Sequence, residues 1–264
     1  MTLQADSQRA AAAPFKPCVV IPFYNHPTTI GTVLSALRPF GLPCFVVDDA
    51  SDDVSSQTVT QLAVQESKWI QVLRHERNQG KGGAVMTGCN AAFALGYSHA
   101  LQIDADGQHD VNDVAQLLSL ARENPTAVIS GVPIYDESIP KSRLYGRYIT
   151  HVWVWINTLS LEIRDSMCGL RVYPLHAVVP LWNSAQLGRR MDFDVEVLVR
   201  LAWRGVRVIG LPTKVTYPAD GISHFDAWRD NVAISGMHAR LFFGMLVRIP
   251  IILVNRLRRR LTAT

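Results

Sequence analysis

Short apolar segments alternate with segments of helical periodicity through the first half of the chain, and this alternation constrains the fold more than any other feature. Strands that alternate with helices form a mostly parallel sheet, because each helix carries the chain back across one face of that sheet. The sequence therefore predicts an α/β fold with helices on both faces. The expected strands span residues 19–23, 45–47, 70–73, 101–103 and 127–130, and the expected helices span 28–37, 54–66, 79–95 and 111–123.

The chain has 264 residues, of which 48% are hydrophobic, so it can bury one substantial core. We expect a flexible leader over residues 1–14, which lacks the apolar segment of a secretion signal, one α/β domain over 15–236 and a basic tail over 237–264. Four cysteines without a Cys-x-x-Cys pair indicate buried thiols in a reducing compartment, and hence a cytoplasmic protein. The net charge of +4 is mild, and no nucleic-acid partner is expected.

Two carboxylates, one residue apart, follow the expected strand at 101–103. Asp104 and Asp106 can converge on one hard divalent cation, which a nucleoside diphosphate can also coordinate, and Gln108 and His109 are possible further ligands. Asp-x-Asp pairs also occur in loops where aspartates cap helices. The pair therefore predicts a divalent-cation site only in combination with the other residues at this edge of the sheet.

Polar residues also end the neighbouring strands. Tyr24 and Asn25 follow the first expected strand and Asp49 follows the second, at the carboxyl edge where parallel sheets bind ligands. The Asp49 carboxylate can accept the imide N–H of uracil or guanine, or it can cap the next helix. Asp104 is placed to bond a ribose hydroxyl or a metal-bound water.

A glycine-rich segment with one lysine opens the expected helix at 79–95. Residues 78–84 read Asn-Gln-Gly-Lys-Gly-Gly-Ala, and free backbone N–H groups beside the Lys81 ammonium would favour phosphate oxygens. The spacing matches neither the P-loop nor the dinucleotide fingerprint. Close packing of the helix on the sheet is the alternative explanation for the glycines.

Four segments together resemble the family 2 glycosyltransferases in order and spacing, namely residues 20–25, 46–53, 78–82 and 104–109. The resemblance covers about residues 18–215, and the chain looks most like the branch of dolichyl- and polyprenyl-phosphate sugar synthases. It implies a GT-A (Rossmann-like) fold, a Mg²⁺ or Mn²⁺ ion and inversion at the anomeric carbon. It also implies that the base is surrounded by Pro22, Tyr24 and Asp49, and that ribose and metal are held by Asp104 and Asp106.

Two segments of the second half resemble family segments near the reacting groups. Residues 165–171 are similar to an Asp-x-x-x-Gly-x-Arg segment beside the donor diphosphate and the acceptor, where Arg171 would clamp phosphate oxygens. Residues 191–196 resemble the acidic stretch from which many relatives draw a catalytic base. The candidates there are Asp192, Asp194 and Glu196, and the sequence does not determine which of them faces the cleft.

The acceptor decides which of these residues matters most. A hydroxyl must lose a proton during attack, so a positioned carboxylate is valuable. A phosphate monoester is already an anion near neutral pH and needs positive charge around it. The candidates for that charge are Arg143, Arg147 and Arg171.

Two apolar segments indicate a membrane surface. Residues 143–161 carry aromatic and aliphatic side chains at helical spacing, as in a helix that lies in a bilayer interface or one that faces a core. Residues 241–254 are apolar but interrupted by Arg248 and Pro250, and six arginines follow Asp230 with no acidic residue among them. The second segment predicts an amphipathic C-terminal anchor with arginines on anionic headgroups, or a helix that packs on the domain or on a partner subunit.

These expectations together describe an inverting, metal-dependent glycosyltransferase, peripheral on the cytoplasmic face of the membrane, that moves a sugar from a UDP- or GDP-sugar to a lipid-linked or polyprenyl-phosphate acceptor. A family member that acts on a hydroxyl of a glycan, glycolipid or aromatic lipid is the alternative. A nucleotidyltransferase and a non-catalytic scaffold are remote alternatives, since the former usually has a glycine-rich loop where this chain has residues 22–27. The oligomeric state is not predicted.

Overall fold

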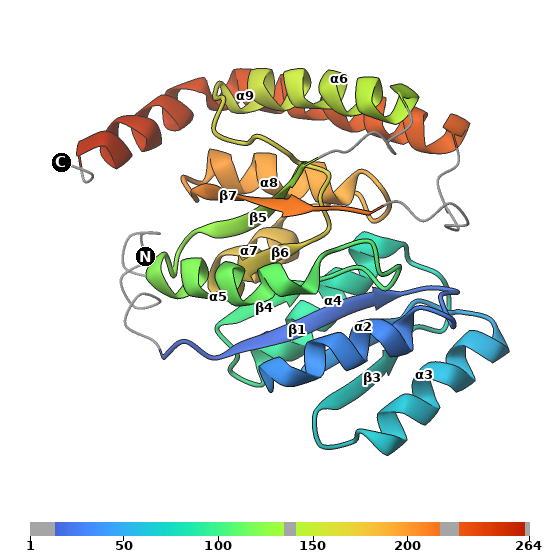
Figure 1. Cartoon of the computed structure of the whole chain (residues 1–264). Coiled ribbons are helices and arrows are strands. Elements are labelled where there is room, and N and C mark those ends of the chain that lie inside the picture. Colours follow the sequence, from blue (N-terminus) through green and yellow to red (C-terminus); the bar gives the residue numbers. More distant parts are fainter. Residues whose placement is uncertain (1–13, 135–140, 217–226, 262–264) are drawn as a thin grey trace.

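The computed structural model describes residues 14–134, 141–216 and 227–261, and a sheet of seven strands lies at its centre (Figure 1). The strands are β1 (Pro17–Phe23), β2 (Cys44–Asp48), β3 (Ile70–Arg74), β4 (His99–Gln102), β5 (Val128–Ile134), β6 (Arg171–Pro174) and β7 (Val208–Lys214). Their order across the sheet is β3-β2-β1-β4-β6-β5-β7. Within this described sheet, β6 is antiparallel to both neighbours and all other neighbours are parallel, so the predicted mostly parallel sheet is confirmed.

Helices cover both faces of the sheet, as the alternation predicts. One face carries α2 (Ile30–Leu37), α3 (Asp53–Gln65) and α5 (Val114–Glu123), and the other carries α4 (Lys81–Ala94), α7 (Leu175–Ser184) and α8 (Phe193–Trp203). Successive strand residues point to opposite faces, so in β1 Val20 joins the core under α4 and Ile21 the core under α2. All four cysteines are free and buried in these two cores.

Local sequence explains where several helices begin. The Asp52 carboxylate caps α3 by accepting the backbone N–H of Ser55 at 2.8 Å. The helix expected at 111–123 begins as a short 3₁₀ helix, η2 (Val111–Asp113), because the Asp110 carboxylate accepts the N–H of Asn112 and starts a tight turn before α5.

The second half of the chain adds a layer beyond α8. The helices α6 (Lys141–Thr158) and α9 (Ala227–Leu261) lie side by side, and both contact α8 (Figure 1). α9 has 35 residues, about 52 Å at 1.5 Å per residue, and continues through Pro250. The apolar segment 241–254 therefore lies within one long helix. Its segment Asp230–Leu257 could cross a membrane by length and composition alone, and 28% of the apolar window in it is buried.

Candidate active site

The carboxyl ends of β1, β2 and β4 lie at one edge of the sheet, and the start of α4 links them. The backbone N–H groups of Gln79 and Gly80 donate to the two carboxylate oxygens of Asp49 after β2, both at 2.8 Å. The next residue, Lys81, reaches Asp104 after β4 at 2.8 Å. The structure therefore brings the residues predicted for the donor to one edge, and these are Pro22, Tyr24, Asn25, Asp49, Lys81, Asp104 and Asp106.

Asn25 joins the loop after β1 to the loop after β2. Its side-chain oxygen accepts the N–H of Asp52 at 2.9 Å, and its own N–H donates to the hydroxyl of Ser51 at 3.1 Å. Asn25 has φ of 54°, a left-handed conformation that asparagine tolerates better than most residues. Asn25, which was predicted to contact the donor, therefore also fixes the loop beside Tyr24.

The Asp49 carboxylate is buried and already bonded within the protein. In addition to the two N–H groups, its Oδ1 lies 2.7 Å from Nδ1 of His75, whose Nε2 lies 2.9 Å from the hydroxyl of Thr87. Nothing in the sequence singles out His75, because a lone histidine carries no distinctive pattern. Asp49 therefore shapes the 78–80 loop, and its role in reading a base stays a prediction that depends on the second lone pair of Oδ2.

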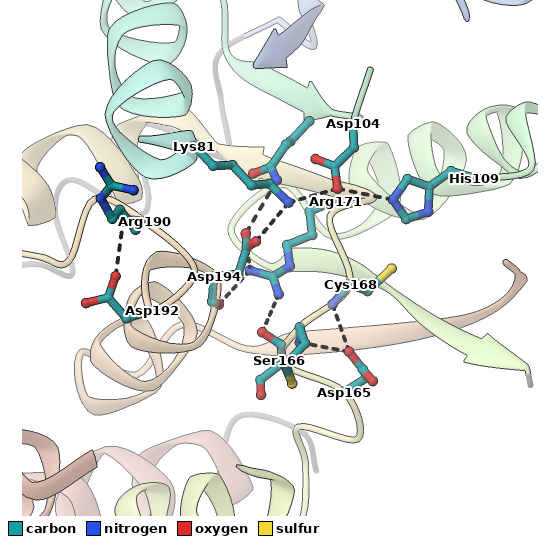
Figure 2. Close-up of polar contacts among 12 residues, drawn as sticks. Lys81, Asp104, His109, Asp165, Ser166, Cys168, Arg171, Arg190, Asp192 and Asp194 are labelled. Atoms are coloured by element: carbon teal, nitrogen blue, oxygen red, sulfur yellow. Dashed lines mark hydrogen bonds and ion pairs between the residues drawn. The ribbon is translucent and has the colours of Figure 1, made fainter. Parts of the chain in front are cut away.

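Lys81 stands between two carboxylates that come from distant segments (Figure 2). Its Nζ lies 2.8 Å from Oδ2 of Asp104 and 3.0 Å from Oδ2 of Asp194, at the start of α8. Burial alone would lower the pKa of Lys81, but the two carboxylates outweigh it and raise that pKa above its ordinary value. Lys81 is therefore held as a cation inside a largely buried group, which we call the acid–lysine cluster (Lys81, Asp104 and Asp194).

Asp106 and Asp104 experience different surroundings. Burial would raise the pKa of Asp104, but Lys81 and His109 hold it below its usual range, and Nε2 of His109 lies 3.6 Å from Oδ2 of Asp104. Burial, and then the charge of Asp104, raise the pKa of Asp106 above its usual range. Gln108 adjoins this pair, and its N–H donates to Oδ1 of Asp106 at 3.0 Å.

The donor set suits a hard cation that takes part of its shell from a ligand. Among the described residues, Oδ1 of Asp104 is buried and has no hydrogen-bond partner. Over the same residues, no group of three or more His, Cys, Asp or Glu side chains is arranged to hold a metal. The two carboxylates, with the unpartnered oxygen of Asp104, therefore fit a cation that takes its remaining oxygens from water or from a bound ligand.

The glycine-rich start of α4 does not offer the free N–H groups that were expected there. The N–H groups of Gly82 and Gly83 donate to the carbonyl oxygen of Arg189, at 2.8 and 3.3 Å. A side chain at Gly82 would also overlap Phe193. The expectation of a backbone phosphate site at these two glycines is wrong, because close packing between the α4 start and the 188–193 segment uses them. Lys81 remains the phosphate candidate.

Arg171 is fully buried at the start of β6. Its guanidinium donates to the carbonyl oxygens of Asp194 and Ser166, both at 2.7 Å, and to the hydroxyl of Tyr173 at 3.1 Å. The prediction that Arg171 clamps donor or acceptor phosphates is therefore wrong, because β6 lies inside the sheet and directs this side chain beneath α8. Arg171 instead holds the start of α8, and with it Asp194, in position.

The acidic start of α8 divides into two environments. Asp194 meets Lys81, whereas Glu196 is fully buried elsewhere. The oxygens of Glu196 accept the N–H of Gly188 at 2.8 Å and the guanidinium of Arg200 at 2.7 and 2.8 Å. Two residues along a helix turn by about 200°, so these neighbours face opposite ways. The structure does not bring Glu196 into the acid–lysine cluster, and of these two residues only Asp194 lies there.

Arg147 on α6 pairs with the first residue of the 165–171 segment. Its guanidinium donates to both oxygens of Asp165, at 2.8 and 2.9 Å, and Nε2 of His151 lies 3.4 Å from the same carboxylate. Burial would raise the pKa of Asp165, but His151 and Arg147 hold it below its usual range. The side chain of Arg143, the other predicted phosphate partner, lies outside the described part of the structure.

The 165–171 segment adjoins the acid–lysine cluster at Gly169. A side chain there would overlap the carboxylate of Asp104, so only glycine allows this approach. The N–H of Cys168, the residue before it, donates to Asp165 at 2.8 Å. Residues 166–168 therefore separate Asp165, the partner of Arg147, from Gly169 beside Asp104.

α6 and α9 expose apolar side chains along their outer faces, and we call this area the α6/α9 surface. Trp153 of α6 contacts Phe242 of α9, with ring centroids 6.2 Å apart, so the two faces adjoin. Exposure of the apolar face of α6 contradicts the core-facing alternative for this helix. The exposed apolar residues include Tyr145, Tyr148, Ile149, Val152, Trp153 and Ile156 of α6, and Phe243, Leu246, Val247, Val254 and Leu257 of α9.

Two tail arginines whose side chains are described contact other parts of the protein. Arg248 lies over the ring of Trp203, at 5.2 Å, and Arg256 donates to the carbonyl oxygens of Thr158 and Leu159 at the end of α6. The prediction that the tail arginines contact headgroups is therefore wrong for Arg256. The side chains of residues 258–260 lie outside the described part.

Comparison with known proteins gives a family and a fold. The model for "Glycosyl transferase family 2" matches residues 18–175, which are 158 of the 264 residues. The chain is similar to a UDP-N-acetylglucosamine–dolichyl-phosphate N-acetylglucosaminyltransferase of Methanococcus voltae, with 27% identity over 215 residues that cover 75% of this chain and 85% of the relative. It is also similar to a polyprenol monophosphomannose synthase of Mycolicibacterium smegmatis, with 24% identity over 220 residues and 78% and 79% coverage.

A solved structure shares the fold. Glucosyl-3-phosphoglycerate synthase from Mycobacterium tuberculosis, in complex with phosphoglyceric acid, aligns with a TM-score of 0.62 at 16% identity, and the match covers 90% of this chain and 81% of that one. The match to the family model ends before α8, so Asp194 lies beyond it.

Proposed function

Because the chain belongs to glycosyl transferase family 2 and has its GT-A fold, we propose that it transfers a sugar, with inversion, from a UDP- or GDP-sugar to a polyprenyl phosphate. The observation that carries this proposal is the acid–lysine cluster, in which Lys81 joins Asp104 and Asp194. The cluster combines carboxylates suited to a cation and ribose with a lysine suited to phosphate. Two similar proteins named for dolichyl phosphate and polyprenol support the choice of acceptor.

On the donor side, the base would lie between Pro22, Tyr24 and Asp49, and the ribose beside Asp104. A cation, Mg²⁺ or Mn²⁺, would be held by Asp104, Asp106 and Gln108, since Oδ1 of Asp104 has no partner among the described residues. When bound, that ion supplies positive charge that stabilises the departing diphosphate. Lys81 adds a second positive charge by exchanging a carboxylate for a phosphate oxygen.

A phosphate acceptor removes the need for a general base. Its second pKa is about 6, so the attacking oxygen is already anionic near neutral pH. Both oxygens of Asp194 already face cations, at 3.0 Å from Lys81 and 3.5 Å from Arg171, so accepting a proton would require an ion pair to open. Asp194 therefore holds Lys81 in place, and Arg147 and Arg143 on α6 attract the acceptor phosphate.

The α6/α9 surface is the proposed contact with the membrane. α6 carries exposed apolar side chains outward and the buried ion pair of Arg147 inward, so one helix would contact both the lipid chain and its phosphate. The part of α9 within the expected tail, 237–261, forms the rest of this contact. Four free cysteines support a reducing, cytoplasmic side of the membrane.

The test is a matrix of UDP- and GDP-sugars against undecaprenyl phosphate in detergent, each with Mn²⁺, Mg²⁺ or EDTA. We expect one donor class to yield a sugar-phosphate lipid and an equal amount of nucleoside diphosphate in the presence of metal. A parallel series uses undecaprenol, which has a hydroxyl in place of the phosphate. Transfer to the hydroxyl and not to the phosphate would overturn the proposed acceptor.

A further inference from the structure

α6 buries little apolar surface for a helix of 18 residues. Its described buried residues are mostly polar, because its apolar face lies outward on the α6/α9 surface. A helix without a buried apolar face depends on specific contacts to stay in place. The buried residues of α6 are Thr150, His151, Val154, Asn157 and Thr158.

The C-terminal end of α6 receives such contacts from α9. The guanidinium of Arg256 donates to the carbonyl oxygens of Thr158 and Leu159, which have no partner within the helix. The partial negative charge at a helix C-terminus favours a cation at this place. Arg256 is thus a cap for α6 that comes from a different helix.

The residue before Arg256 fixes the same corner to α8. The side-chain amide of Asn255 donates to the carbonyl oxygen of Trp203, the last residue of α8, at 3.1 Å. The indole N–H of Trp203 donates in turn to the carbonyl oxygen of Asn157 at 2.7 Å. Asn255 and Arg256 therefore join the ends of α6 and α8, and we call this pair the α9 clasp.

The same helix carries Arg147 toward its other end. Arg147 precedes Thr158 by eleven residues, or about 16 Å along the helix axis. It pairs with Asp165, and the 165–171 segment contacts Asp104 through Gly169. α6 therefore extends from the α9 clasp to the segment beside the acid–lysine cluster.

We propose that the α9 clasp positions α6 so that Arg147 can bind the acceptor phosphate, an inference that rests on the proposed function. Asn255 and Arg256 are positioning residues, because their hydrogen bonds go to the ends of α6 and α8 and not to the acid–lysine cluster. Without Arg256, the last carbonyls of α6 lose their cap and the helix shifts against α8. Acceptor binding then weakens, while the donor residues on β1, β2, β4 and α4 are unaffected.

The experiment compares Arg256→Ala and Arg256→Lys with the matched control Arg248→Ala, which removes the same charge from the same helix but no bond to α6. Full-length proteins are assayed with a short-chain, water-soluble polyprenyl phosphate, so that membrane binding does not contribute. We expect Arg256→Ala to raise the acceptor KM at least fivefold and to leave the donor KM unchanged. Arg256→Lys should restore part of the acceptor affinity, since lysine keeps the positive charge but lacks the planar guanidinium that donates to both carbonyl oxygens.

Hydrogen exchange of the backbone amides reports the clasp independently of turnover. In Arg256→Ala we expect exchange to accelerate at least fivefold from the end of α6 back to Arg147, and in Arg248→Ala to stay as in the wild type. A wild-type acceptor KM, or an equal loss of donor and acceptor binding, would overturn the positioning role. Acceleration confined to residues 156–159 would also overturn it. Failure of the wild type to use any polyprenyl phosphate would instead reject the proposed function.

Discussion

Nζ of Lys81 lies 3.0 Å from Oδ2 of Asp194, which joins the start of α4 to the start of α8 within the candidate active site. The same ammonium lies 2.8 Å from Oδ2 of Asp104. The charge of Lys81 is thus shared by two carboxylates. In the proposed function, a donor phosphate oxygen replaces one of these carboxylates at Lys81.

Replacement of Lys81 by methionine tests this exchange. We expect the affinity for the accepted nucleoside diphosphate, in the presence of Mn²⁺, to fall at least tenfold, since the cation for its phosphates is lost. The affinity for Mn²⁺ alone should not fall, because Lys81 competes with the metal for Asp104. Isothermal titration calorimetry measures both, and the exposed Lys16→Met, at the opposite edge of the sheet, is the control. An unchanged nucleotide affinity in Lys81→Met would refute the exchange.

Asp194 and Glu196 should respond differently to amide substitutions. Asp194→Asn removes one of the two negative charges beside Lys81, so we expect kcat to fall at least tenfold. Glu196→Gln weakens buried hydrogen bonds from Gly188 and Arg200, so we expect a loss of about 2 kcal/mol in the free energy of unfolding and near-normal kcat. Urea unfolding and steady-state kinetics separate the two effects. A large loss of kcat in a stable Glu196→Gln protein would return Glu196 to the catalytic group.

The edge of the sheet that carries the site follows from the sequence because topology fixes it. Parallel strands end at one edge, so Tyr24, Asp49 and Asp104 had to lie near one another once the alternation of strands and helices was recognised. Lys81 is predicted at the same edge because its segment, 78–82, is one of the four that resemble the family in order and spacing. Asp194 is different, because no pattern in the sequence around it predicts that it lies beside Lys81. The proposed exchange of ion pairs at Lys81 therefore could not be predicted from the sequence.

The errors concern the directions of side chains and contacts between distant segments. Arg171 begins an antiparallel strand that is inserted between β4 and β5, and spacing alone does not reveal that this position points beneath α8. Glu196 follows Asp194 by two residues, and its direction depends on α8 being helical from Phe193. The contacts of Gly82 with Arg189 and of Arg256 with α6 join residues about 100 apart, which the spacing of residues cannot predict.

The α6/α9 surface predicts membrane binding that depends on its apolar side chains. Val247 on α9 is 81% exposed and Val64 on α3 is 73% exposed, so the two valines form a matched pair. We expect Val247→Asp to reduce binding to phosphatidylcholine–phosphatidylglycerol vesicles several-fold, since inserting a charged side chain into the bilayer costs free energy. Val64→Asp should bind as the wild type does. Equal binding by all three proteins in vesicle sedimentation would remove this surface as the membrane contact.

His238 makes stability depend on pH. Burial lowers its pKa to about 4, against about 6.5 in an unfolded chain, so the unfolded state takes up its proton first as the pH falls. Stability is therefore lost between about pH 6.5 and pH 4. The loss from pH 7 to pH 5 should be on the order of 1 kcal/mol larger in the wild type than in His238→Gln, measured by urea unfolding. Parallel pH profiles for the two proteins would contradict this assignment.

The most direct test of the account is mass spectrometry of the lipid product formed from a nucleoside-diphosphate sugar and undecaprenyl phosphate. The wild type and Asp53→Ala, which alters an exposed aspartate on α3, should both form a sugar-phosphate lipid with Mn²⁺ and none with EDTA. Asp106→Ala should form none while keeping the wild-type melting temperature. A product formed by Asp106→Ala at the wild-type rate, or no lipid product from the wild type with any UDP- or GDP-sugar, would contradict the account.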